Sequence, residues 1–288
     1  MSANENSLFQ SGVVKKCPLD VGSSETRRKT TIQQVSPHRP RTRRGANKKE
    51  IGSFLAGLID SDGHWSAIPQ LVISFEQRES SLAHYVKKTI GYGQVHPVQG
   101  KAALRYVCAH RDGMRKIALL CAPYLRHPDK WFHYSSRCAP VLGVAQSPPC
   151  SGPLLDDWWL AGFFVGDGSI SCRIVDRPGR SMESRFLLRI DQKGALLLKK
   201  IQEELGGSIG YRHKQDTYYY SSVSYKNAVR WINYLDRAFL MGVKLTTYAI
   251  WRKAFLLVQQ GRHRTPLGEE KLRRMALKIA VRNGGKTG

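Results

Sequence analysis

Two aspartates, Asp62 and Asp167, stand at equivalent places in two similar segments of the chain. They come near the ends of the sequences FLAGLIDSDG and WLAGFFVGDG, and a glycine directly follows each acid. Each segment is an apolar run too long and too poor in alternation for a strand, so we expect a buried helix that the glycine stops. Both carboxylates would then lie at the negative ends of helix dipoles.

Small residues in the two segments would allow the two helices to pack closely. They are Ser53, Ala56, Gly57, Ala161 and Gly162. Close packing would bring the two carboxylates together, which raises the energy of both, and a divalent cation would relieve that repulsion. A ligand set made only of oxygen atoms favours Mg²⁺, and phosphate oxygens can complete the coordination shell of that ion. We therefore predict two or more Mg²⁺ ions shared by Asp62 and Asp167, which could activate water for phosphodiester hydrolysis.

The sequence around each segment repeats as well. Gln77 matches Gln192 and Lys130 matches Lys244 at a nearly constant separation, and the second copy has an extra charged segment at residues 173–183. Helical spacing and period-2 alternation predict the order αββαββα in each copy. We therefore predict an α+β fold of two pseudo-symmetric units, packed through the two motif helices and each carrying an antiparallel sheet.

Shifts in composition divide the chain into five parts. Proline-rich sequence separates the two repeats, and basic, apolar-poor sequence flanks them. Such stretches are typical of linkers and tails. The predicted parts are a basic, extended tail at 1–48, a first repeat at 49–145, a linker at 146–153, a second repeat at 154–260 and a basic C-terminal tail with a helix at 261–288.

The overall composition indicates a polyanionic partner. In 288 residues, 46 Lys and Arg stand against 22 Asp and Glu, which gives a formal net charge of +24. The apolar runs are too short to span a bilayer, so we expect no membrane association. The six cysteines form no C-x-x-C pair, which favours buried thiols over a zinc site. The Ser- and Arg-rich, acid-poor N-terminal region is similar to an organellar transit peptide and predicts a mitochondrial location in preference to a chloroplast one.

The two motifs resemble the signature of the LAGLIDADG homing endonucleases, in the single-chain form with two copies. The resemblance covers residues 51–258. It implies a monomer in which the motif helices form a pseudo-twofold interface and the last acid of each motif, Asp62 or Asp167, binds the catalytic metals. It also implies that the two sheets form a saddle on double-stranded DNA, with each of two active sites cutting one strand.

The resemblance extends to other candidate catalytic residues. Gln77 and Gln192 resemble polar residues that order active-site water, and Lys130 and Lys244 lie where the family has a basic residue near the scissile phosphate. Val165 departs from the motif, since the first copy has Asp60 at that position. This earlier acid is not the metal ligand in the family, so both metal-binding acids are retained.

Basic and aromatic residues interleave in the predicted strands of the second copy. Alternation of Arg185, Leu187 and Arg189 with apolar residues predicts a sheet with one core face and one exposed face. The candidate nucleic-acid-binding residues are Arg185, Arg189, Arg212, Lys214, Tyr218 and Tyr220. Alternation also puts Tyr219 on the opposite face from its two tyrosine neighbours, and the pattern does not tell which of those faces is buried.

Two functions from different classes fit these features. The first is a sequence-specific, metal-dependent endonuclease that cuts double-stranded DNA at a long asymmetric site. The alternative is a LAGLIDADG scaffold that binds RNA without cleavage, as an intron maturase or as a structural component of an organellar ribosome. The positive charge of the two tails suggests this alternative, because such tails could bind intron or ribosomal RNA. A transcription regulator that lost cleavage is a third hypothesis.

Overall fold

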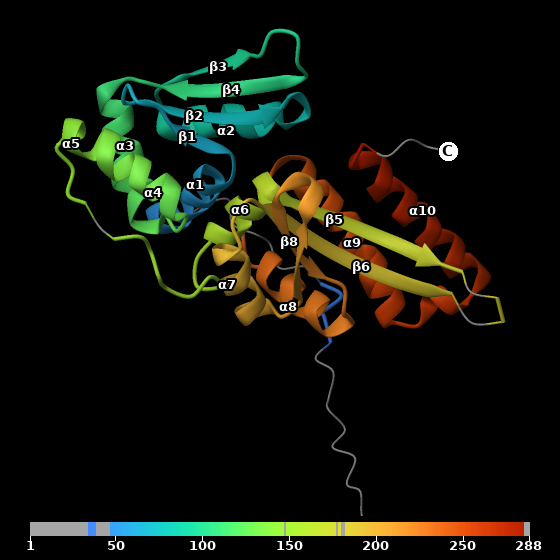
Figure 1. Ribbon diagram of the computed structural model, residues 1–288. Coiled ribbons are helices and arrows are strands. Elements are labelled where there is room, and N and C mark those ends of the chain that lie inside the picture. Colours follow the sequence, from blue (N-terminus) through green and yellow to red (C-terminus); the bar gives the residue numbers. More distant parts are fainter. Residues whose placement is uncertain (1–33, 39–46, 147, 177, 180–181, 285–288) are drawn as a thin grey trace, which may run out of the picture. The chain divides into compact units, whose positions relative to one another are not determined.

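Two repeats with the same element order form most of the described chain (Figure 1). The computed structural model describes residues 34–38, 47–146, 148–176, 178–179 and 182–284, all within one compact unit, 33–288. The first repeat comprises α1 (Lys48–Asp62), β1 (Gly63–Trp65), β2 (Leu71–Glu76), α2 (Ser80–Ile90), β3 (Gln94–Pro97), β4 (Ala103–Cys108) and α3 (Arg111–Cys121). The second comprises α6 (Trp159–Asp167), β5 (Gly168–Val175), β6 (Glu183–Gln192), α7 (Leu196–Leu205), β7 (Ser208–Arg212), β8 (Thr217–Ser222) and α8 (Tyr225–Leu235). The predicted order αββαββα is confirmed twice.

Further helices follow each repeat. They are α4 (Pro128–His133) and α5 (Ala139–Leu142) after the first repeat, and α9 (Gly242–Gln259) and α10 (Pro266–Arg282) after the second. Helix α10 lies within the region expected to be a basic tail, but it packs on α9 and β5 and buries Leu272 and Ile279. None of the described helices is long and apolar enough to cross a membrane.

Each repeat contains a four-stranded antiparallel sheet, with strand orders β1-β2-β4-β3 and β5-β6-β8-β7. In β6, Phe186, Leu188 and Ile190 are buried, as the alternation predicted. Helices α7, α8 and α9 contact this sheet, and α1 and α2 contact the first one. Each sheet therefore has one face on the core and one open face.

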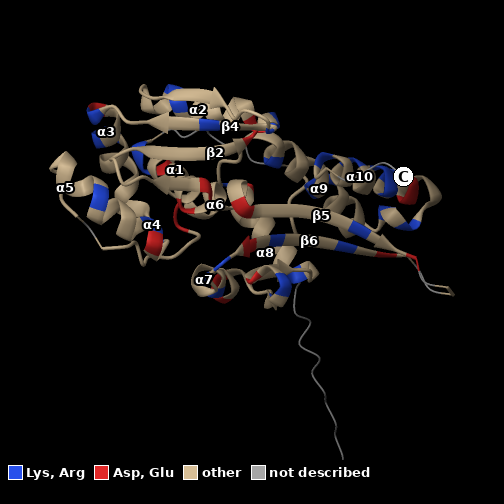
Figure 2. Cartoon of the chain, turned by 45° about the horizontal axis from the view of Figure 1, so that its top comes forward, with Lys and Arg blue, Asp and Glu red and all other residues tan. Residues whose placement is uncertain are grey.

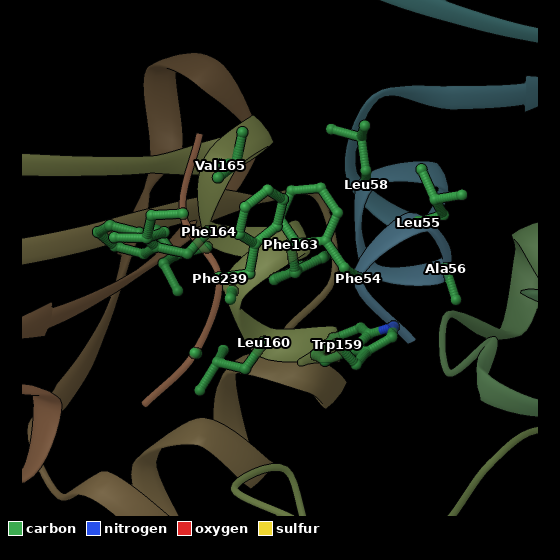
Figure 3. Close-up of a cluster of buried hydrophobic side chains, with 14 of the residues drawn as sticks. Phe54, Leu55, Ala56, Leu58, Trp159, Leu160, Phe163, Phe164, Val165 and Phe239 are labelled. Atoms are coloured by element: carbon green, nitrogen blue, oxygen red, sulfur yellow. The ribbon is translucent and has the colours of Figure 1, made fainter. Parts of the chain in front are cut away.

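The motif helices α1 and α6 pack against each other backbone to backbone (Figure 3). A Cβ added to Gly57 would lie 2.7 Å from the main-chain nitrogen of Phe163 and closer still to the Trp159 carbonyl oxygen. A Cβ on Gly162 would lie 2.8 Å from the carbonyl carbon of Phe54. No side chain fits at either glycine, so the predicted close packing is confirmed.

Two segments outside the repeats are fixed by buried arginines. Arg126 pairs with Asp157 at 2.8 Å and donates to main-chain oxygens of the linker. Arg252 pairs with Asp236 at 2.8 Å and donates to the carbonyl of Ser36. Residues 34–38, the described part of the expected N-terminal tail before residue 47, therefore dock on the second repeat, while 1–33 and 39–46 lie outside the described residues.

The helix contact gives a direct test of the packing. Gly162→Ala should destabilise the protein by about 3 kcal/mol, because the added methyl group meets main-chain atoms that cannot rotate away. Gly194→Ala is the matched control, since an added Cβ there meets nothing within 4 Å; it should change stability by less than about 1 kcal/mol. Urea unfolding of both variants measures the difference, and equal stabilities would contradict the inferred contact.

Candidate active sites

Asp62 and Asp167 are the last residues of the two packed helices. The glycine after each acid turns the chain into extended conformation and begins a strand, β1 or β5. A Cβ added to Gly166 would lie 2.6 Å from Oδ2 of Asp62, so this carboxylate lies against the end of the partner helix. The two acids are thus brought together by the helix pair that carries them.

Both carboxylates resist ionisation. Burial raises the pKa of Asp167 to about 7, with a further rise from the negative charge of Asp62. Burial also raises the pKa of Asp62 to about 6, although its side chain still reaches solvent. Lys130 and Lys244 lower both pKa values but do not offset the burial. Negative charge here is costly, and a bound cation would reduce that cost.

Two hollows flank the helix pair, one at each aspartate. Asp62 lines the first with Glu76, Glu79 and Lys244. The second hollow is lined by Asp167, Gln192, Lys130, His64, His127, His133 and Asp191, among others. Each hollow thus combines the acid of one repeat with the lysine of the other.

The two lysines hold equivalent positions. Lys130 is the third residue of α4 and Lys244 the third residue of α9. Each Nζ donates to the carbonyl of the glycine that follows the motif helix of its own repeat, Gly63 or Gly168. Burial lowers the pKa of Lys244, and the carboxylates of Glu79 and Glu76 oppose that shift. The structure therefore brings both predicted lysines to the aspartates.

The two predicted glutamines differ. Gln192 lies at the end of β6 and donates its side-chain N–H to Oδ2 of Asp167. Gln77 is exposed on the 3₁₀ turn η1 (Gln77–Glu79) and lines a separate hollow with residues 76, 78 and 102. Strand pairing aligns Ile73 with Ile190, so the counterpart of Gln192 is Phe75. The matching of Gln77 with Gln192 was wrong, because β6 ends one residue sooner after the aligned isoleucine than β2 does, and α7 is one residue shorter than α2.

The tyrosines of β8 also require a correction. Tyr220 is fully buried; its hydroxyl donates to the Gly206 carbonyl at 2.7 Å and accepts from the indole of Trp231 at 2.9 Å. Tyr218 shares that strand face and packs against the core. The prediction that Tyr220 contacts nucleic acid was therefore wrong, and Tyr218 lies on the same core side. Tyr219 is the residue that alternation places on the open face.

Arginines gather around Tyr219 on the open face of the second sheet. The guanidinium carbons of Arg189 and Arg212 lie 5.2 and 4.9 Å from its ring centre, within cation–π range. Arg212 also pairs with Asp191 at 2.9 Å. Period-2 alternation alone could have proposed Tyr219, but only the packing of its two tyrosine neighbours on the core identifies its face.

The charge of this open face extends along β5 and β6 (Figure 2). Arg173 lies directly opposite Arg185 across these strands, and Arg185 pairs with Glu183 at 2.8 Å. Like charges opposite each other cost stability unless an anion binds between them. Lys214 is exposed on the turn between β7 and β8. In contrast, β2 of the first sheet contains neither Lys nor Arg.

The donor set fits a hard divalent cation. Within the described ranges, no group of three or more His, Cys, Asp or Glu side chains is close enough to form a complete metal cage. The two carboxylates with raised pKa values offer oxygen ligands. Such a set suits Mg²⁺, which retains waters and takes its other ligands from phosphate.

The raised pKa of Asp167 predicts a pH-dependent stability in the absence of divalent ions. Its carboxyl has a pKa of about 7 when folded and an ordinary pKa of 3.8 when unfolded. Between these pH values the unfolded chain binds fewer protons, so stability falls as pH rises. Asp167→Asn removes this loss. We expect the variant to match the native chain near pH 4 and to exceed it by about 1 kcal/mol near pH 7.5. Urea unfolding in EDTA tests this, and a pH-independent difference would contradict it.

Comparisons with known proteins identify related sequences and a shared fold. The sequence pattern described as "LAGLIDADG endonuclease" matches residues 160–255, in the second repeat. The "Uncharacterized cox1 intron-2 37.2 kDa protein" of Schizosaccharomyces pombe is 38% identical over 269 residues, which are 89% of this chain and 81% of the relative. The "Intron-encoded RNA maturase bI4" of Saccharomyces cerevisiae is 24% identical over 184 residues, 61% of this chain and 27% of the relative.

A solved structure shares the fold. The I-LtrWI LAGLIDADG homing endonuclease bound to target DNA superposes with a TM-score of 0.63 at 16% identity, over 81% of this chain and 98% of the other. The resemblance read from the two motifs is thereby confirmed. With a relative this similar over most of both sequences and the family's pattern in the second repeat, the chain belongs to the LAGLIDADG endonuclease family.

Proposed function

We propose that the chain is a Mg²⁺-dependent endonuclease that cuts both strands of DNA at a long asymmetric site and acts as a monomer. One observation carries this proposal: each aspartate at the end of the helix pair shares a hollow with the lysine of the other repeat. A chain with two such sites could cut the two strands of a duplex, one strand at each site. The crystallised relative was bound to its target DNA, which supports DNA as the substrate.

In this proposal, Asp62 and Asp167 hold the metal through their carboxylate oxygens. Bound Mg²⁺ would supply Lewis acidity at the phosphate and lower the pKa of a bound water. Lys130 and Lys244 place a positive charge beside the scissile phosphates. Gln192, which donates to Asp167, fixes that carboxylate and can orient water near it. The first site has no glutamine at the corresponding strand position.

The open sheet faces are the proposed DNA-binding surface. Arg189 and Arg212 flank Tyr219 and lie where they can contact base edges and phosphates. Because the first sheet is poorer in arginine, the half-site on the second sheet should contribute more of the salt-dependent affinity. A mitochondrial location is also part of the proposal, supported by the acid-poor N-terminal sequence and by a relative named for a cox1 intron.

The cleavage test uses single and combined aspartate variants. DNA selected from a randomised pool by the Asp62→Asn, Asp167→Asn double variant provides the substrate, because that variant should bind without cutting. We expect the native chain to cut both strands in Mg²⁺, each single variant to nick one strand only, and the double variant to lose both activities. Strand-specific end labels separate the products. Absence of cleavage by the native chain in any divalent metal would overturn the proposal.

RNA binding is the second candidate function, and the similarity to an intron-encoded RNA maturase favours it. That relative is much longer than this chain, so its activity does not transfer directly. Intron or ribosomal RNA would then bind the basic surfaces of the chain, without cleavage.

One pair of variants, measured on both nucleic acids, distinguishes the candidates. Arg189→Ala should weaken binding by about 1–3 kcal/mol. The control, Arg185→Ala, should have a smaller effect because Glu183 already neutralises that arginine. Binding to the selected DNA and to an intron transcript is compared at one salt concentration. If the loss occurs with RNA and not with DNA, the RNA-binding candidate replaces the endonuclease.

A further inference from the structure

At one buried position of the motif helices, α1 has a charged residue, Asp60, where α6 has an apolar one, Val165. Oδ2 of Asp60 accepts the main-chain N–H groups of Arg126 at 2.7 Å and His127 at 3.1 Å, and the indole N–H of Trp159 at 2.8 Å. Residues 126 and 127 immediately precede α4, which carries Lys130 in its first turn. Asp60 therefore fixes the start of the helix that presents this lysine.

Val165 cannot accept a hydrogen bond, so the second repeat must hold its lysine helix in another way. The first turn of α9 is contacted instead by Glu79, which comes from the first repeat. The main-chain N–H of Val243 donates to both carboxylate oxygens of Glu79, at 3.1 and 3.2 Å. Val243 directly precedes Lys244. The residue before α9, Met241, makes no side-chain cap hydrogen bond, so Glu79 supplies an N-terminal contact from outside the helix.

Gly242 is adapted to this contact. Its φ of +63° lies in the left-handed region that side chains disfavour. A Cβ added there would lie 2.8 Å from the Cδ of Glu79 and closer still to one carboxylate oxygen. Glycine at this position therefore permits both the turn into α9 and the approach of the glutamate.

We propose that Glu79 is the positioning residue of the Asp62 site, replacing in the second repeat the contact that Asp60 makes in the first. This inference rests on the proposed endonuclease function. By holding the first turn of α9, Glu79 keeps Lys244 bonded to the Gly168 carbonyl and beside Asp62. A carboxylate at a helix N-terminus is also favoured by the helix dipole.

The contact links the site to the first sheet. Glu79 ends the turn η1, which directly follows β2, so the strand that faces the proposed DNA surface leads into the residue that holds α9. The Asp62 site thus depends on a contact between repeats, whereas the contact of Asp60 with the loop before α4 lies within the first repeat. Loss of Glu79 should therefore impair one site only.

The test compares Glu79→Ala with Glu204→Ala. Glu204 is the matched control, because its carboxylate likewise accepts a main-chain N–H from a distant segment, that of Leu154 at 2.8 Å, but it lines neither hollow. The Asp62→Asn and Asp167→Asn variants assign each strand to a site. Glu79→Ala should slow cutting of the Asp62-site strand about tenfold or more and leave the other strand unchanged, so nicked DNA accumulates. Glu204→Ala should keep the native ratio of the two strand-cleavage rates.

A conservative variant and a second measurement complete the test. Glu79→Gln should recover most of the rate, since its amide oxygen can still accept from Val243. Amide exchange at Val243 should quicken in Glu79→Ala and not in Glu204→Ala, whether or not the chain cuts DNA. Equal slowing of both strands, or unchanged exchange at Val243, would overturn the inference. No cleavage by the native chain, with faster exchange in Glu79→Ala, would instead overturn the proposed function alone.

Discussion

The main-chain contact between α1 and α6 at Gly57 and Gly162 is the constraint on which both sites depend. The two helices run so close together that neither glycine has room for a Cβ, and they therefore end side by side. That ending brings Asp62 against α6 and places Asp167 in the electrostatic field of Asp62. The packed aromatic and aliphatic side chains around the contact stabilise an arrangement that the carboxylates alone would oppose (Figure 3).

The two repeats are symmetric in their backbone but not in their side chains. Strand order, helix order and the bond from each lysine to its glycine carbonyl are common to both repeats. The surroundings of the aspartates are not: glutamates border Asp62, whereas histidines and Gln192 border Asp167. The open face of the second sheet is also the richer in arginine. Repeats in one polypeptide can diverge in this way, which suits a target whose two halves differ in sequence.

How much the sequence predicts depends on the range of the interaction. The motif helices and the strand alternation in β6 follow from local patterns, and the structure has them. Gln77 was matched wrongly because spacing counts residues without knowing where a strand ends. Tyr220 was misplaced because alternation defines two faces and only packing decides which one is buried. Glu79 has no signal at all in the sequence, since its partner lies on another repeat.

The placement of the lysines explains why the aspartates remain suited to a metal. In the described part of the chain, neither Lys130 nor Lys244 forms an ion pair with Asp62 or Asp167; each amine is bonded to a glycine carbonyl instead. The lysines lower the pKa of both acids from a distance, which favours ionisation without occupying the carboxylate oxygens. A direct ion pair would satisfy those oxygens and compete with a cation. In the proposed site, Asp60 and Glu79 fix α4 and α9, so each amine stays close enough to favour ionisation of the acids without occupying their oxygens.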